Sequence, residues 1–126
     1  MSANMSQTIE INLDLDTKAL AKGATETIAY VMAAIFCMNV FDATATIFWV
    51  TAGFATEANP LMDELLRVHP VAFMTVKLLL IGLGISLLWM RREHWLSRAG
   101  CASLFVVYVG ISLYHMLGVG WVTGLV

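Results

Sequence analysis

Three long apolar runs constrain this chain more than any other feature of its sequence. They cover Ile28 to about Thr51, Val71 to Met90, and Ala99 to about Val119. Each run is close to the roughly 20 residues that an α-helix needs to cross a bilayer. The chain has 126 residues, of which 60% are hydrophobic and 13% charged, and a soluble domain of this size cannot bury so much apolar surface. The sequence therefore predicts an all-α integral membrane protein, with a bundle of three helices over residues 28–121.

The connecting segments differ in their basic residues. Lys18 and Lys22 precede the first run, and the 91–98 loop contains three arginines, whereas the 53–70 loop has only Arg67. Lysine and arginine in short loops stay on the cytoplasmic side. We therefore expect a multi-pass protein of the cell (inner, cytoplasmic) membrane, with a cytoplasmic N-terminus and an external C-terminus.

The tail over residues 1–27 contains one patterned stretch, "TIEINLDLD". Its apolar residues alternate strictly with polar ones, which is the pattern of a half-buried strand. A lone strand is unstable in water, so two predictions for 8–16 stay open: it is disordered, or it adds to a sheet in a partner or a second copy. A short helix is expected next, capped by Asp16 or Thr17 and ended by Gly23.

The 53–70 loop contains the signals of a short helix. Asn59 is a good N-cap, Pro60 suits the first helical position, and Asp63 and Glu64 follow in the first turn. His69 and Pro70 end this helix, and Pro70 begins the second span. An apolar stripe predicts that the helix lies on the outer membrane surface; it consists of Leu61, Met62, Leu65, Leu66 and Val68.

Each apolar run also contains a polar stripe. An ionisable residue at the centre of a spanning helix costs about 2.5–3.5 kcal/mol on insertion scales, so such residues usually face the bundle interior and form pairs. The stripes are Asn39, Asp42 and Thr46 in the first run, Lys77 in the second, and Tyr108, Ser112 and His115 in the third.

The depths of these residues allow them to meet. With a rise of about 1.5 Å per residue, Asp42 lies roughly 10 Å below the outer surface, Lys77 about 9 Å and His115 about 6 Å. All three lie in the outer third of the bilayer, beneath the loop that carries Glu57 and Asn59. We expect an Asp42–Lys77 ion pair. The candidate polar cluster, or ion or proton site, is Asn39, Asp42, Thr46, Glu57, Asn59, Lys77 and His115.

At these positions the chain resembles a small prokaryotic membrane family catalogued as a domain of unknown function, number 5658. The resemblance follows the pattern N-x-x-D-A-x-x-T, then E-A-N-P-L-M and a lysine downstream. It covers roughly Ile28 to Gly118 and implies a membrane protein with no assigned activity. The matching residues are Asn39, Asp42, Ala43, Thr46, Glu57, Ala58, Asn59, Pro60, Leu61, Met62 and Lys77.

Two functions remain open from the sequence. The first is a non-enzymatic scaffold or accessory subunit, in a homo-oligomer or a larger membrane complex; the second is a small proton- or cation-coupled transporter or channel subunit. No enzyme signature is present, and only one histidine lies in a span, whereas a haem between helices would need two. We therefore expect no catalysis, no cofactor, no metal and no nucleic-acid partner.

Overall fold

The computed structural model describes residues 2–123 and consists of four helices in this range. They are α1 (Ser2–Thr51), α2 (Pro60–Val68), α3 (Pro70–Met90) and α4 (Trp95–Thr123). No residue of this range lies in a strand, so the all-α prediction is confirmed. The helices α1, α3 and α4 are each long and apolar enough to cross a membrane, which agrees with the three predicted spans.

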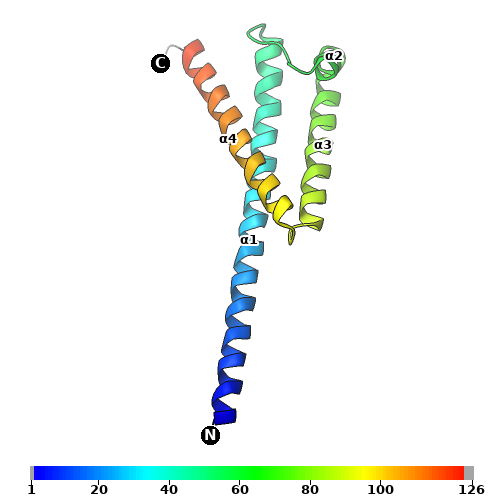
Figure 1. Ribbon diagram of the computed structural model, residues 1–126. Coiled ribbons are helices and arrows are strands. Elements are labelled where there is room, and N and C mark those ends of the chain that lie inside the picture. The colour runs from blue at the N-terminus through cyan, green and yellow to red at the C-terminus, as the bar shows by residue number, and fades with distance from the viewer. Residues whose placement is uncertain (1, 124–126) are drawn as a thin grey trace.

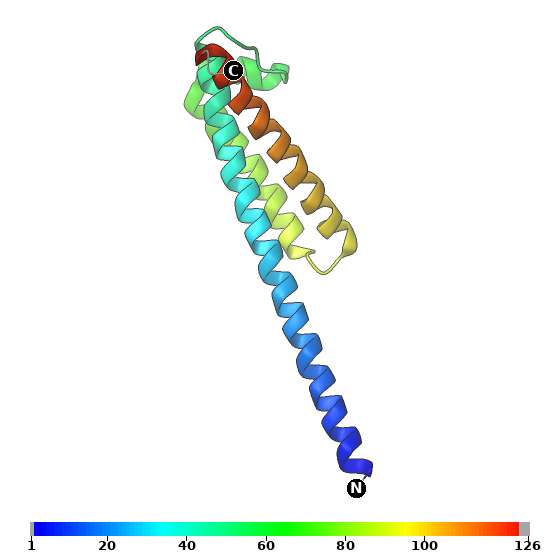
Figure 2. The same ribbon diagram turned by 90° about the vertical axis from the view of Figure 1, so that its left-hand side faces the viewer.

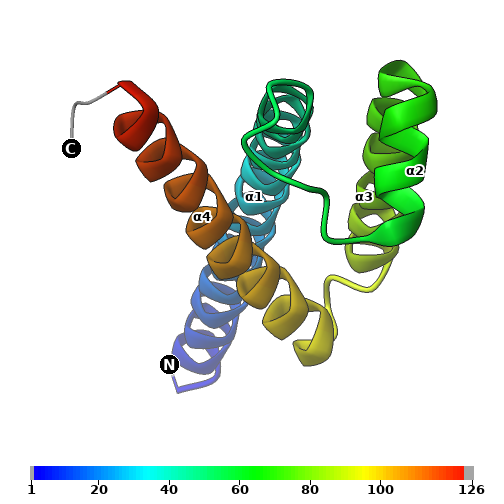
Figure 3. The ribbon, with the colours of Figure 1, turned by 90° about the horizontal axis from the view of Figure 1, so that it is seen from above.

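Helix α1 is the central element of the bundle (Figure 1). It packs against α3 on one side and against α4, which crosses it at an angle. The short helix α2 covers the start of α3 at one end of the bundle, which we call the α2 end. Seen from that end, α4 diverges from α3 as it approaches its C-terminus (Figure 3). The two outer helices are therefore joined mainly through α1.

The N-terminal half of α1 extends beyond the bundle as a single helix (Figures 1 and 2). Neither the strand nor the disorder expected for 8–16 is present, because this stretch lies inside α1. The expected helix end at Gly23 is also wrong, since α1 continues through that residue.

Backbone hydrogen bonding explains this correction. A strand needs a neighbouring strand, whereas a helix satisfies its own backbone groups, and a segment that extends an existing helix avoids the cost of nucleation. An i,i+4 ion pair of 2.6 Å between Lys18 Nζ and Asp14 Oδ2 gives further support. In a helix, residues two apart lie on different faces and residues four apart on the same face. The alternating pattern therefore places Ile9 and Leu13 on one face and Ile11 on another, and Ile9 and Leu13 are 61% and 63% exposed.

The turn between α1 and α2 is fixed by local signals at both ends. Gly53 has a φ of +78°, and its N–H donates to the Val50 carbonyl while the N–H of Phe54 donates to that of Trp49. This is a Schellman C-cap, which favours glycine at the left-handed position. At the other end, Asn59 Oδ1 accepts from the Leu61 N–H at 3.1 Å. The predicted N-cap, and the start of α2 at Pro60, are confirmed.

Two apolar clusters hold the helices together on either side of the polar residues. Phe73 of α3 is fully buried against Ala43 of α1 and against Met62 and Leu66 of α2. Nearer the α3–α4 turn, Met32 and Ile35 of α1 pack against Cys101 of α4. Most other large apolar side chains are exposed, as expected for helices surrounded by lipid. The polar side chains of the bundle lie between the two clusters.

Candidate functional site

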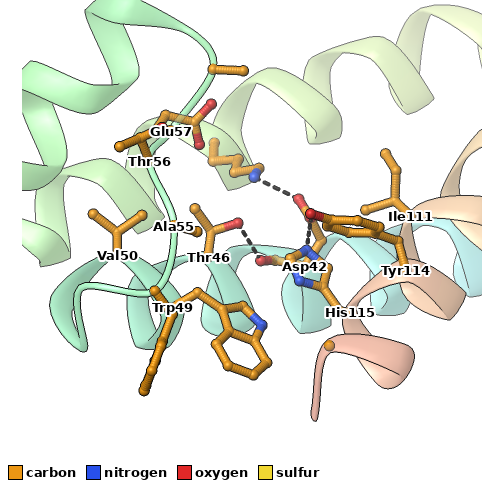
Figure 4. A pocket seen from close by; sticks show the side chains of 14 residues that line it. Asp42, Thr46, Trp49, Val50, Ala55, Thr56, Glu57, Ile111, Tyr114 and His115 are labelled. Atoms are coloured by element: carbon orange, nitrogen blue, oxygen red, sulfur yellow. Dashed lines mark hydrogen bonds and ion pairs between the residues drawn. The ribbon is translucent and has the colours of Figure 1, made fainter. Parts of the chain in front are cut away.

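Asp42 is the centre of the polar site (Figure 4). Its side chain is buried on α1, and its two carboxylate oxygens contact two different helices. Oδ2 lies 2.5 Å from Lys77 Nζ of α3, and Oδ1 lies 2.9 Å from His115 Nε2 of α4. The ion pair expected between Asp42 and Lys77 therefore forms, and His115 joins it. One carboxylate links all three long helices.

The contact with Asp42 fixes the tautomer of His115. A carboxylate oxygen accepts, so Nε2 must carry the proton that it donates. Nδ1 of the same ring is buried and has no hydrogen-bond partner among the described residues. In the neutral ring this nitrogen is an acceptor. His115 therefore uses one nitrogen in the site and leaves the other unpaired.

Neighbouring groups hold the three ionisable residues in place. Lys77 Nζ lies 5.3 Å from the centre of the Phe73 ring, a cation–π distance. The ring of His115 packs edge-on against Phe41 and Tyr114. Thr46 does not contact the charges: its hydroxyl donates to the backbone carbonyl of Asp42 at 2.8 Å. Thr46 thus lies beside the charged residues, but its hydroxyl forms a hydrogen bond only within α1.

A second polar layer lies one helical turn nearer the α3–α4 turn. Asn39, almost fully buried on α1, donates from Nδ2 to the Tyr108 hydroxyl of α4 at 2.7 Å. Its own carbonyl oxygen and the Ser112 hydroxyl are buried without a partner in the described part of the chain. The predicted stripes of α1 and α4 therefore face each other along two layers.

A cavity of about 550 Å³ lies over Asp42 at the α2 end. Helices α1, α3 and α4 form its walls, and the 54–58 segment covers it. Trp49 and Glu57 line it together with Asp42, Lys77 and His115. In Figure 4, the side chain of Glu57 extends from the covering segment toward Asp42 and His115. This volume lies within the range of small-molecule sites in proteins.

A second cavity of about 340 Å³ adjoins the first. Glu57 and Lys77 line both cavities, so these two side chains lie between them. Asn39 and Tyr108 line only the second. Asn59 also lines it, but its side-chain oxygen caps α2. Of the seven predicted cluster residues, Lys77 and His115 contact Asp42 directly, and the other four lie around these three.

The polar stripes predicted from the sequence do not include the aromatic wall of the larger cavity. Trp49 is buried and lines this cavity. Extending the α1 stripe from Asp42 and Thr46 by one further turn would have included it. Phe54 and Tyr114 complete the wall, and no spacing in the sequence connects these two residues.

The part of the chain that the structure describes contains no cluster of three histidine, cysteine or carboxylate residues arranged for a metal ion. Cys37 and Cys101 are free thiols. The ionisable groups that line the larger cavity are the carboxylates of Asp42 and Glu57, the ammonium of Lys77 and the imidazole of His115, and aromatic rings lie beside them. Such a set can form ion pairs, exchange protons or bind a polar ligand.

Comparison with known proteins gives one match. Residues 33–123 match the family described as Domain of unknown function (DUF5658). No curated protein and no solved structure matches the chain. The match includes the polar residues of all three long helices, and it confirms the resemblance noted in the sequence.

Proposed function

The chain belongs to this family of unknown function, and we propose that it is a non-enzymatic membrane scaffold or accessory subunit. One observation carries the proposal: a single buried carboxylate, Asp42, holds both α3 and α4 to α1. A buried charge is tolerated when it is paired and hydrogen-bonded, and the pair then fixes how the helices align. Lys77 and His115 supply these two contacts.

Exchanging the two charges tests this role. We expect Asp42→Lys and Lys77→Asp each to lower the melting temperature in detergent, because like charges then face each other or His115. The double exchange should recover most of the loss. His115 can accept from a lysine at position 42 if its proton moves to Nδ1, the nitrogen that has no partner among the described residues. A double variant no more stable than the weaker single variant would contradict the scaffold role.

A second candidate function is a proton- or cation-coupled transporter or channel subunit. The cavity over Asp42 favours it, since two carboxylates line a space of about 550 Å³. The same double exchange distinguishes the two functions when proteoliposome flux is measured beside stability. A transporter should lose flux in the stable double variant, because the charge order along the path is reversed. A scaffold should show no protein-dependent flux in either form.

We further propose that the α2 end faces outward and the N-terminus faces the cytoplasm. The distribution of charge supports this: Lys18, Lys22 and the arginines of 91–98 lie away from the α2 end, where Arg67 is the only basic residue between α1 and α3. In intact cells, an impermeant thiol reagent should label Glu64→Cys and should miss Glu93→Cys until the membrane is opened. The unsubstituted chain, with Cys37 and Cys101 in spans, is the control. Labelling of Glu93→Cys in intact cells would invert the orientation.

The projecting part of α1 supports a role within a homo-oligomer or a larger complex. Its apolar side chains, Ile9 and Leu13 among them, are exposed outside the bundle, and burying them against another chain is favourable. Light scattering, with the detergent contribution subtracted, should therefore give the purified particle a protein mass above the 13.8 kDa of one chain. Ile9→Gln with Leu13→Gln should weaken the association and keep the helix. A monomer with no co-purifying protein would contradict the proposal.

A further inference from the structure

We propose that the cavity over Asp42 binds a small organic cation, with its ammonium group on Glu57 and its apolar part against Trp49. This inference concerns Glu57 and the cavity wall, so it does not depend on whether the Asp42–Lys77 pair serves as a scaffold. Two observations carry it: the charge balance of the cavity and its aromatic wall.

The charge balance leaves one carboxylate uncompensated. Four ionisable residues line the cavity, and Asp42 and Lys77 neutralise each other at 2.5 Å. His115 carries no net charge when only Nε2 is protonated. No ion pair joins Glu57 to any side chain that the structure describes, although Oε1 accepts from the Asn59 N–H at 3.0 Å. With His115 neutral, the cavity holds one net negative charge, on Glu57, and the Asn59 N–H holds that carboxylate in position.

The aromatic wall selects the kind of cation. The indole of Trp49 is buried and packs edge-on against Phe54, with 6.0 Å between ring centres. Tyr114 lines the cavity from α4. Aromatic faces attract cations, most strongly the indole of tryptophan, and cages of this kind bind substituted ammonium groups. A volume of about 550 Å³ suits an organic molecule better than a single inorganic ion.

The imidazole of His115 adds a polar group to the wall of the cavity. The side chain is about nine-tenths buried and lines the cavity, yet Nδ1 has no partner among residues 2–123. This nitrogen is itself enclosed by protein atoms, so it makes the wall more polar without being in reach of a ligand in the present orientation of the ring. Choline and arylethylamines carry both an ammonium group and a second polar or aromatic part of suitable size.

The substituted ammonium group has two sources, a soluble amine or the headgroup of an amine lipid. The experiment therefore measures the melting temperature of the full chain in two settings. In amine-free detergent, the probes are choline, phenethylamine and 3,3-dimethylbutan-1-ol, the neutral isostere of choline. In nanodiscs, phosphatidylglycerol alone is compared with a mixture that contains phosphatidylethanolamine. Stabilisation by choline or phenethylamine identifies a soluble ligand, and stabilisation by phosphatidylethanolamine alone identifies a lipid headgroup.

The control variants test the assignment to Glu57. Glu57→Gln keeps the acceptor for the Asn59 N–H, so the empty protein should melt as the wild type does. Its dissociation constant for choline or phenethylamine should rise about 10-fold or more, because the attraction between the ammonium charge and the carboxylate is lost. Glu64→Gln removes an exposed carboxylate of α2 outside the cavity and should leave binding unchanged. The inference is overturned if the neutral isostere stabilises as strongly as choline, if Glu57→Gln binds as tightly as the wild type, or if no amine stabilises the protein.

Discussion

Asp42→Asn is expected to lower the free energy of unfolding by about 3–5 kcal/mol, the usual cost of removing one partner from a buried pair. The variant leaves Lys77, whose side chain is only 21% exposed, without its counter-charge. It also weakens the hydrogen bond from His115 Nε2. The loss can be measured by thermal or denaturant unfolding in detergent. The matched control is Asp14→Asn, because Asp14 forms an exposed pair with Lys18 in the projecting part of α1, and such pairs contribute at most about 1 kcal/mol.

Adding Lys77→Met to Asp42→Asn should restore much of this stability. Neither residue then carries a charge that must be desolvated, and methionine fills a similar space. The wild type, the two single variants and the double variant form a double-mutant cycle, whose coupling energy isolates the pair. A coupling energy of zero would show that the two side chains do not interact in the folded protein. Recovery of stability with loss of a cellular phenotype would assign Asp42 to function rather than folding.

Phe73→Ala is expected to have the second large effect, a loss of about 3–5 kcal/mol. The side chain is fully buried between α1, α2 and α3, and truncation leaves a void where the ring was. It also removes the aromatic face near Lys77 Nζ. We expect α2 to detach first, because Met62 and Leu66 lose the surface they pack against. Faster backbone hydrogen exchange over 60–68 than over 70–90 would record this.

Leu79→Ala provides the control for Phe73→Ala. Leu79 lies on the same helix but is 61% exposed, and substitutions at such positions usually change stability by no more than about 0.5 kcal/mol. Phe73→Leu, which keeps most of the apolar volume, should lose much less than Phe73→Ala. Equal losses at positions 73 and 79 would contradict the packing of α2 against α3.

The level of each polar residue along the bundle could be predicted from the sequence, because it follows from the rise of a helix and the ends of the apolar runs. The caps of α2 could be predicted as well, since Asn59 and Pro60 act through local geometry. These two signals were enough to place Asp42, Lys77 and His115 at one level of the bundle.

The shape of the space above them could not be predicted in the same way. It depends on the angle at which α4 crosses α1, which is set by contacts such as that of Gly118 with Trp49. A Cβ atom added at Gly118 would lie 3.5 Å from the indole, an ordinary van der Waals contact, so alanine would fit there and only a side chain longer than alanine would meet the ring. The path of the 52–59 segment, which brings Glu57 over the site, depends on the same packing.

A strand or disorder was predicted for residues 8–16 because the alternating pattern was considered apart from the first membrane span, with which it forms one helix. In the structure, α1 continues without interruption from Ser2 to Thr51. A period of two is then no evidence for a strand, because the backbone conformation is set by the neighbouring turns.

The continuity of α1 also makes it a mechanical lever. Asp42 lies 40 residues from Ser2 on the same helix, about 60 Å at the usual rise, and no described residue between them leaves the helical conformation. A partner that tilts the projecting part will tilt the segment inside the bundle, and a twist applied at the tail will turn Asp42 relative to Lys77 and His115. The contacts of one carboxylate are thus joined, by a single uninterrupted helix, to a point about 60 Å away along the chain.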